Sequence, residues 1–172
     1  MASSSILKTR LIDTPLAPMQ AVADENHLYL LEFSEYHRLE KQTNQLKRLI
    51  KSEIALDTTP IIDTLEEELN AYFQGTLKQF KTPLFFSGTP FQKRTWEALL
   101  KIPYGETQSY AGIAASLHHP TAFRAVANAN GANRLAIIIP CHRVINSNGK
   151  LGGYGGGINR KQWLLDHEKK HA

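Results

Sequence analysis

Short runs of alternating apolar residues in the first part of the chain predict three β-strands. These runs are rich in β-branched and large apolar side chains, and turn-forming residues separate them, as is typical of strands. The predicted strands cover residues 6–12, 19–23 and 27–33. Because the connections between them are short, we expect neighbouring strands to pair as an antiparallel meander.

After the last predicted strand, the apolar spacing lengthens to the period of an α-helix. A helix over 34–54 places its large apolar residues on one stripe. A second helix is predicted from Pro60, which suits a first helical turn, after the capping residue Thr59, and it stops at Gly75. The predicted inward residues of the two helices are Leu39, Leu46, Leu49 and Ile50, then Leu65, Leu69, Tyr72 and Phe73.

The second half of the chain favours short helices. Thr89 and Pro90 again place a capping residue before a proline and predict a helix that ends before Pro103. Two shorter helices are predicted over 110–117 and 120–130. Two residues separate them, so the pair is similar to a helix-turn-helix.

The most apolar run of the chain, residues 135–139, predicts a buried strand that ends at Cys141. Residues 146–149 have the composition of a hairpin turn, and a glycine-rich segment, residues 152–157, follows. The last helix is predicted from Asn159 onward.

The net charge of +4 is unevenly distributed along the chain. Residues 88–172 hold 11 Lys and Arg against 4 Asp and Glu, a net charge of +7, whereas residues 1–87 carry −3. This step predicts two domains, 1–87 and 88–172, with different partners. A basic domain with two helices in this arrangement favours contact with DNA.

The composition indicates a cytoplasmic protein. A single cysteine excludes an internal disulfide and a cysteine-rich zinc cluster. The first five residues are polar, and charged residues interrupt the apolar ones after them, so we expect no export signal. No run of the sequence is long enough to span a bilayer, and no membrane partner is expected.

Cys141 is the candidate nucleophile. A lone cysteine is more often a small buried apolar residue, but His142 and Arg143 can supply a base and a positive environment for a thiolate. Glu168 is the best-placed carboxylate to orient the imidazole. On an extended strand Cys141 and His142 point to opposite faces, so their cooperation requires a turn or a bridging water.

These motifs resemble those of a known family. The chain resembles the O6-alkylguanine-DNA alkyltransferases, or methylated-DNA–protein-cysteine methyltransferases, of bacterial type, in Pro140-Cys141-His142-Arg143-Val144, Arg124-Ala125-Val126, Asn133, Gly153-Tyr154 and Trp163-Leu164-Leu165. The resemblance implies an α+β fold in two domains. The first is RNase H-like, with a three-stranded antiparallel sheet and helices, and the second is helical and winged-helix-like, with a helix-turn-helix.

The resemblance implies direct-reversal DNA repair. An alkyl group moves irreversibly from O6-alkylguanine, and from O4-alkylthymine, in double-stranded DNA to Cys141 after the nucleotide is flipped. Nothing in the site would hydrolyse the thioether, so each molecule reacts once. We expect no cofactor, no metal and no obligate protein partner, and therefore a monomer.

The resemblance also implies roles for single residues. His142 works through a water with Glu168 to generate the Cys141 thiolate. Tyr110 turns the target phosphate and hydrogen-bonds the departing guanine, and Arg124 fills the gap that the flipped base leaves.

A hinge, a DNA-binding surface and a substrate pocket are implied in the same way. The hinge is Asn133, the DNA-binding residues are Arg124, Tyr110, Ala125, Thr121 and Asn130, and the pocket residues are Val144, Tyr154, Gly155 and Gly156. Gly155 replaces a serine or alanine of the relatives, which predicts a wider alkyl pocket.

Two other classes of function are compatible with parts of this pattern. A Cys-His thiol hydrolase needs an oxyanion hole and a water route, and it turns over. A non-catalytic lesion-binding protein lacks the nucleophile, and the presence of Cys141 argues against it.

Overall fold

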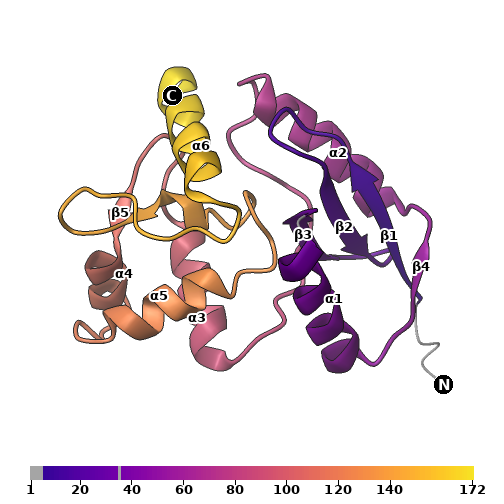
Figure 1. Ribbon diagram of the computed structural model, residues 1–172, viewed down its shortest axis with the longest axis horizontal. Helices are drawn as coiled ribbons and strands as arrows, with labels where there is room; N and C mark the ends of the chain where they lie inside the picture. Colours follow the sequence, from indigo (N-terminus) through magenta and orange to yellow (C-terminus); the bar gives the residue numbers. More distant parts are fainter. Residues whose placement is uncertain (1–5, 35) are drawn as a thin grey trace. The chain divides into compact units, whose positions relative to one another are not determined.

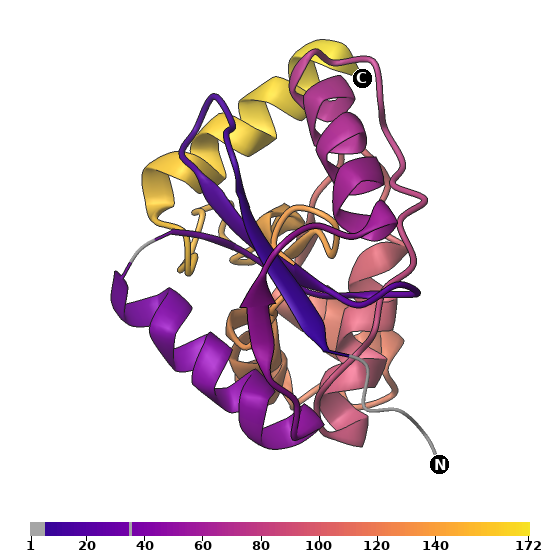
Figure 2. The ribbon, with the colours of Figure 1, turned by 90° about the vertical axis from the view of Figure 1, so that its right-hand side faces the viewer.

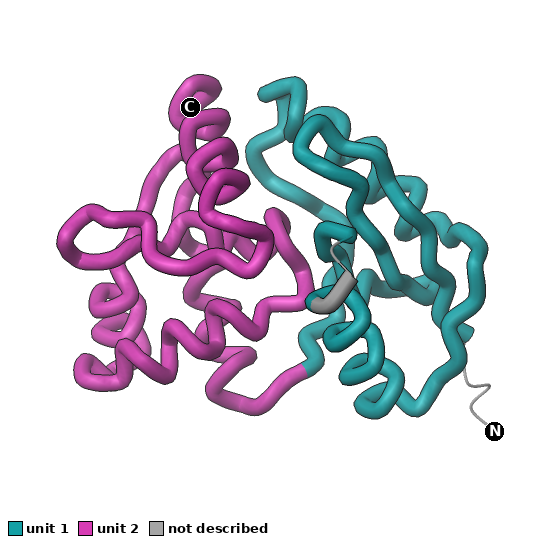
Figure 3. Tube along the Cα trace, in the orientation of Figure 1, with its two compact units in different colours: residues 1–87 teal, residues 88–172 magenta. Residues whose placement is uncertain are grey.

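The computed structural model describes residues 6–34 and 36–172, and the chain divides into two compact units, residues 1–87 and 88–172 (Figure 3). The polar segment 1–5, from which we expect no export signal, lies outside the described residues. Within the described part of the chain, every helix is too short or too polar to cross a membrane.

The first unit is built on one sheet, whose strand order is β3-β2-β1-β4 (Figure 1). The predicted antiparallel meander is confirmed, because β2 pairs in antiparallel fashion with both β1 and β3. The prediction of three strands is wrong, since β4 adds to β1 in parallel. The strands are β1 (Leu7–Ile12), β2 (Met19–Ala23), β3 (Leu28–Phe33) and β4 (Ile54–Leu56).

The fourth strand exists because the first helix stops earlier than predicted. Helix α1 spans Tyr36–Ile50 and not 34–54. Lys51 follows with φ of 55°, a left-handed conformation that ends the helix and turns the chain back toward β1. Leu46 is buried in the core, with Leu39 and Ile50 packed against the same cluster. Leu49 was predicted on this stripe, but it lies exposed on the outer side of the helix.

Helix α2 (Pro60–Phe73) follows the predicted capping pattern. The Thr59 side chain accepts a hydrogen bond from the Ile62 amide, and Gly75 has φ of 82° after the helix end. Figure 2 shows α1 and α2 on opposite sides of the strands. The two helices contact β3 and β2 respectively, and all six residues of β3 are buried.

The second unit contains four α-helices and two very short strands. Helix α3 starts with a capping box, in which Thr89 and Gln92 each bind the backbone of the other. The Trp96 indole donates to the Ala129 carbonyl at 2.9 Å, which fixes α3 against α5. The elements are α3 (Pro90–Leu100), β5 (Gln108–Ser109), α4 (Tyr110–Ser116), α5 (Phe123–Gly131), η1 (Cys141–Arg143), β6 (Val144–Ile145) and α6 (Ile158–His171).

The pair α4 and α5 forms the predicted two-helix arrangement, with a longer connection than expected. Ser109 caps α4 by accepting from the Gly112 amide at 2.9 Å. His118 has φ of 63°, and the chain makes turns through residues 117–122. Helix α5 therefore begins at Phe123, three residues later than predicted.

The prediction of a strand over 135–139 is wrong. This run is buried, but it makes successive tight turns, with an Ile138 to Ala136 backbone hydrogen bond of 2.8 Å and φ of 70° at Ile137. The turn over 146–149 is present and is closed by the Gly149 amide donating to the Asn146 carbonyl. It does not join two strands of a hairpin, because β6 pairs in parallel with β5.

Candidate active site

The thiol of Cys141 lies at the first residue of the 3-10 helix η1, not at the end of a strand. Cys141 is 6% exposed. Its amide donates to the Ile139 carbonyl at 2.7 Å, and its carbonyl accepts from the Val144 amide and from the Asn130 side chain at 3.3 Å. Both backbone groups of the residue are therefore fixed by the protein.

Asn133 shapes the segment that carries the thiol. Its side-chain oxygen accepts from the Leu135 amide at 2.9 Å, and its nitrogen donates to the Ile139 carbonyl at 3.0 Å. The side chain thus joins both ends of the turn. A β-branched residue at positive φ, as at Ile137, costs about 1–3 kcal/mol. The bonds of Asn133 help to hold this strained backbone in place.

His142 and Glu168 form a buried pair. The His142 Nε2 lies 2.7 Å from Glu168 Oε2. Burial lowers the pKa of His142, although Glu168 acts in the opposite direction, so we treat the imidazole as neutral. Nε2 then donates to the carboxylate and Nδ1 carries the lone pair. Nδ1 is buried and has no hydrogen-bond partner among the described residues.

Arg143 binds the same carboxylate from its other side. Its Nε donates to Glu168 Oε1 at 2.7 Å and its Nη2 to Oε2 at 3.0 Å, while Nη1 donates to the Ile102 carbonyl at 2.7 Å. Burial alone would raise the pKa of Glu168, but the hydrogen bonds and charges of His142 and Arg143 hold it well below its usual range. Glu168 is therefore ionised at neutral pH.

The sequence pattern did not single out Lys161, which is fully buried in α6. A signal for it exists, because Lys161 lies three residues before the buried Leu164 and seven before the buried Glu168. This spacing places all three on one helical face. No motif of the sequence identified the Asn130 contact with the Cys141 carbonyl or the Ile102 contact with Arg143.

A cavity of about 480 Å³ opens between the two-helix pair and the segment after β6. Tyr110, Phe123 and Arg124 line it from the helices, and Gly152 and Gly153 from the loop. Burial and the charge of Cys141 raise the pKa of Tyr110, so its phenol stays protonated at neutral pH. Four residues that we predicted to form the substrate pocket do not line this cavity: Val144, Tyr154, Gly155 and Gly156.

The structure places the five predicted DNA-binding residues in three settings, and one of them, Tyr110, is half-buried at the start of α4. Thr121, Arg124 and Ala125 are exposed around the start of α5. Asn130 was predicted to bind DNA, but it is buried at the other end of that helix and donates to the Cys141 carbonyl. Its contact is with the segment that holds the thiol.

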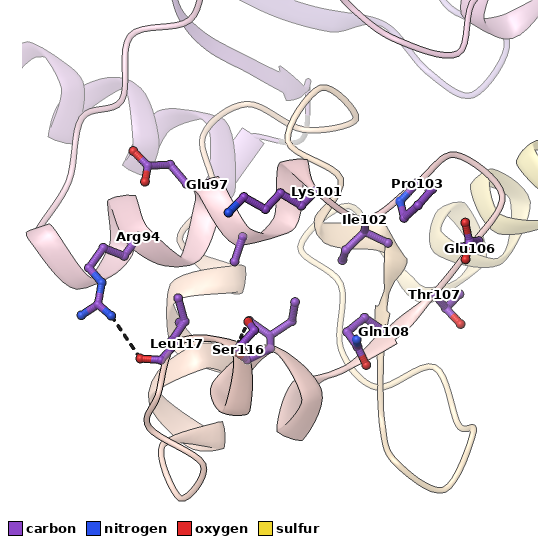
Figure 4. Close-up of a pocket in the computed structure, with 12 residues that line it drawn as sticks. Arg94, Glu97, Lys101, Ile102, Pro103, Glu106, Thr107, Gln108, Ser116 and Leu117 are labelled. Atoms are coloured by element: carbon purple, nitrogen blue, oxygen red, sulfur yellow. Dashed lines mark hydrogen bonds between the residues drawn. The ribbon is translucent and has the colours of Figure 1, made fainter.

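A second cavity, of about 380 Å³, lies between the end of α3 and helix α4 (Figure 4). Arg94, Glu97, Lys101 and Glu106 line it with charges of both signs. The Arg94 guanidinium donates to the Leu117 carbonyl at 3.1 Å.

Within the described ranges, no three His, Cys, Asp or Glu side chains gather where they could share a metal ion.

The fold and the His142–Glu168–Arg143 cluster define a class of protein that combines a pair of short helices, α4 and α5, with a buried cysteine next to a buried carboxylate cluster. Residues 90–170 match the family model described as the DNA-binding domain of 6-O-methylguanine DNA methyltransferase. The methylated-DNA–protein-cysteine methyltransferase of Salmonella typhimurium is 44% identical over 160 residues, which cover 91% of this chain and 92% of the relative. The chain therefore belongs to the methylated-DNA–protein-cysteine methyltransferase family.

Mycobacterial relatives are similar in sequence and in structure. The enzyme of that name from Mycobacterium tuberculosis (strain ATCC 25618 / H37Rv) is 59% identical over 106 residues, which cover 62% of this chain and 64% of the relative. The crystal structure of Mycobacterium tuberculosis OGT in complex with DNA is 43% identical, covers 96% of this chain and 94% of its own, and has a TM-score of 0.82. This likeness confirms the α+β fold with an N-terminal antiparallel sheet and helices.

Proposed function

We propose that this protein repairs alkylated DNA by moving one alkyl group from O6-alkylguanine or O4-alkylthymine to Cys141. It acts as a monomer on double-stranded DNA, flips the damaged nucleotide, and reacts once. In this proposal residues 1–87 form an RNase H-like domain and residues 88–172 a winged-helix-like DNA-binding alkyltransferase domain. The observation that carries the proposal is a buried Cys141 followed directly by His142 and Arg143, both of which bind the buried carboxylate of Glu168.

The cluster supports formation of a thiolate. His142 is neutral, and its Nδ1 lone pair can accept the Cys141 proton through a bridging water. The imidazolium that results lies 2.7 Å from an ionised carboxylate, which stabilises its charge. Arg143 keeps Glu168 ionised and fixed, so the carboxylate is ready before the proton moves.

The transfer itself is a displacement at a saturated carbon. The Cys141 sulfur forms a bond to the alkyl carbon, the bond from that carbon to O6 breaks, and its electron pair stays on the base. A donor that neutralises this charge favours the step. Tyr110 suits this role, because its phenol is protonated, it lies close enough to Cys141 for the charge of the thiolate to raise its pKa, and it lines the cavity of about 480 Å³.

Access to the thiol requires the nucleotide to leave the base stack, which costs a few kcal/mol. Arg124 is exposed on the first turn of α5 and lines the same cavity as Tyr110. A side chain that enters the duplex at this position can fill the gap and offset part of the cost. Asn133, which follows α5, then acts as the hinge that holds residues 135–141, the segment that carries the thiol.

Two observations disfavour a thiol hydrolase. An oxyanion hole needs amides that point at the reacting centre, commonly including that of the nucleophile. The Cys141 amide donates to the Ile139 carbonyl and the Arg143 amide to the Pro140 carbonyl, so neither amide is available.

A non-catalytic lesion-binding protein is disfavoured by the buried His142–Glu168 pair next to Cys141, because DNA binding alone does not require that pair.

A stoichiometry assay tests the proposal. Duplex DNA with a single O6-methylguanine, in tenfold excess, should be repaired to one equivalent of protein and no further. A hydrolase continues to turn over, and a lesion-binding protein repairs none. Cys141→Ser should bind the duplex with unchanged affinity and repair none, because its hydroxyl is far less ionised than a thiol of pKa about 8.5. O4-methylthymine duplex in the same assay tests the second substrate.

A further inference from the structure

Lys161 is a buried charged residue that takes no part in any step of the proposed transfer. Its side chain is 0% exposed, and its ammonium donates to the carbonyls of Val144 at 2.6 Å, Gly153 at 3.2 Å and Leu151. An ammonium has three donors, and all three are used. These bonds satisfy the donors of the ammonium, but carbonyls carry no counter-charge for a buried cation.

The three carbonyls belong to the backbone around the proposed reaction site. Val144 directly follows η1, and Leu151 and Gly153 lie in the segment after the turn at 146–149. The turn and the residues after it, 146–157, contain no helix or strand, so no ladder of backbone hydrogen bonds fixes the shape of this stretch. Gly153 lines the cavity of about 480 Å³. Lys161 thus joins the chain beside the thiol to the wall of the cavity.

The same ammonium faces the side chains that take part in the chemistry. Its Nζ lies 5.9 Å from the centre of the Tyr110 ring, within the range of a cation–π contact. The charge of Lys161 lowers the pKa of His142, and the charge of Cys141 raises the pKa of Lys161. Tyr110 on α4 and Cys141 and His142 on η1 are therefore the titratable groups that it influences.

The charges of this cluster balance when the thiol is ionised and its proton has left the cluster. Arg143 and Lys161 are cations, Glu168 is an anion and His142 is neutral. With Cys141 as a thiol, the buried cluster holds one positive charge in excess. With Cys141 as a thiolate and its proton lost to solvent, the cluster is neutral. While His142 still holds that proton, the cluster keeps its single positive charge. Because charge is costly to bury without a counter-charge, Lys161 favours the thiolate.

We propose that Lys161 is a positioning residue of the transfer site, which ties the Val144, Leu151 and Gly153 carbonyls into one shape and supplies the buried cation that balances the Cys141 thiolate. This inference rests on the proposed function for its role in repair. Its electrostatic part concerns the thiol alone and is measured without DNA.

The first test is the pH profile of Cys141 alkylation by iodoacetamide. Lys161→Met keeps the length and apolar stem of the side chain and removes its charge. At pH 6 the variant should react about tenfold more slowly than the native protein, and the pH of half-maximal reactivity should rise, because fewer thiols are ionised. Lys169→Met, on the exposed side of the same helix, is the matched control and should match the native profile.

Lys161→Met could also react more slowly because it fails to fold. A measurement on the native sequence separates a folding defect from the electrostatic effect on Cys141. Burial lowers the pKa of Lys161 to about 8, and the Cys141 charge acts against that shift. Alkylation converts the thiolate to an uncharged thioether. NMR titration of the lysine ε-carbons should therefore show Lys161 losing its proton at lower pH in the methylated protein than in the unmethylated one.

The outcomes distinguish this inference from the proposed function. An iodoacetamide profile of folded Lys161→Met that superimposes on the native one, or a Lys161 titration that methylation does not move, overturns the inference. Failure of the native protein to accept a methyl group from DNA overturns the proposed function and leaves the iodoacetamide comparison intact. If both hold, Lys161→Met should slow transfer from free O6-benzylguanine and from duplex DNA by similar factors.

Discussion

Replacement of Glu168 by glutamine tests the buried cluster most severely. The carboxylate accepts from His142 Nε2 at 2.7 Å, from Arg143 Nε at 2.7 Å and Nη2 at 3.0 Å, and from the Gly105 amide at 3.4 Å. A glutamine of the same shape keeps one acceptor oxygen. Its NH2 group must face a donor, and the buried Arg143 loses its counter-charge.

The magnitude follows from that loss. Removal of one partner from a buried ion pair costs about 3–5 kcal/mol. Because a domain of this size is stabilised by roughly 5–15 kcal/mol, Glu168→Gln should unfold at a clearly lower urea concentration. Methyl transfer should fall by about 10²-fold or more, since His142 no longer donates to an ionised carboxylate when it accepts a proton. Glu97→Gln, an exposed carboxylate in the same unit, should change stability by less than about 0.5 kcal/mol.

The pH dependence of stability gives a second readout of the same group. The pKa of Glu168 in the folded protein lies below its ordinary value of 4.5. The unfolded chain therefore takes up a proton first as the pH falls, so the stabilisation is present above about pH 4.5 and is lost below it. The stability difference between the native protein and Glu168→Gln should shrink as the pH is lowered through this range.

Urea unfolding and single-turnover repair, measured on both variants between pH 3 and pH 7, check these expectations. A Glu168→Gln protein that loses less than about 1 kcal/mol and repairs at the native rate would contradict the assignment of Glu168 as the centre of the cluster. A loss of stability without a loss of repair would leave Glu168 as a structural residue alone.

The remaining predictions concern DNA entry, pocket width and helix capping. Arg124→Ala should slow repair of duplex DNA while it spares reaction with free O6-benzylguanine, and equal losses on both substrates would mean that Arg124 does not act inside the duplex. Gly155→Ser should lower the rate for benzyl relative to methyl substrates, with pocket discrimination of about 1–3 kcal/mol per methylene. An unchanged rate ratio would show that Gly155 does not set pocket width. Thr89→Ala should reduce stability by about 1 kcal/mol in urea unfolding, because the capping bond to Gln92 is lost.

The sheet and the capped helices were predictable because local signals agree with the tertiary structure. Strands β1 to β3 have apolar runs bounded by turns, and α2 and α3 each begin with a threonine and a proline. Strand β4 was missed because Ile54–Leu56 is too short to show a period of its own. Its pairing with β1 is a contact between residues far apart in the sequence.

The thiol segment could not be predicted from its composition. Three consecutive isoleucines have high β-propensity, yet tertiary contacts outweigh it. The Asn133 side chain binds both ends of the run, and Ile137 takes a positive φ. Cys141 consequently starts a 3-10 helix, and the expectation of a buried strand that ends at Cys141 was wrong.

The catalytic pair and the buried lysine differ in how visible they are in the sequence. His142 and Glu168 were predicted as partners, and the structure brings them to 2.7 Å. Lys161 gives no such signal by residue type, because most lysines are exposed. Only its helical spacing to Leu164 and Glu168 marks it as a core position.

Peptide mapping by mass spectrometry tests the central claim most directly. After incubation with duplex DNA that contains O6-methylguanine, the protein should carry one added methyl group, located on the peptide that contains Cys141. Cys141→Ser, treated in the same way, should carry none. A methyl group on any other residue, or an unmodified protein beside repaired DNA, would contradict the assignment of Cys141 as the acceptor.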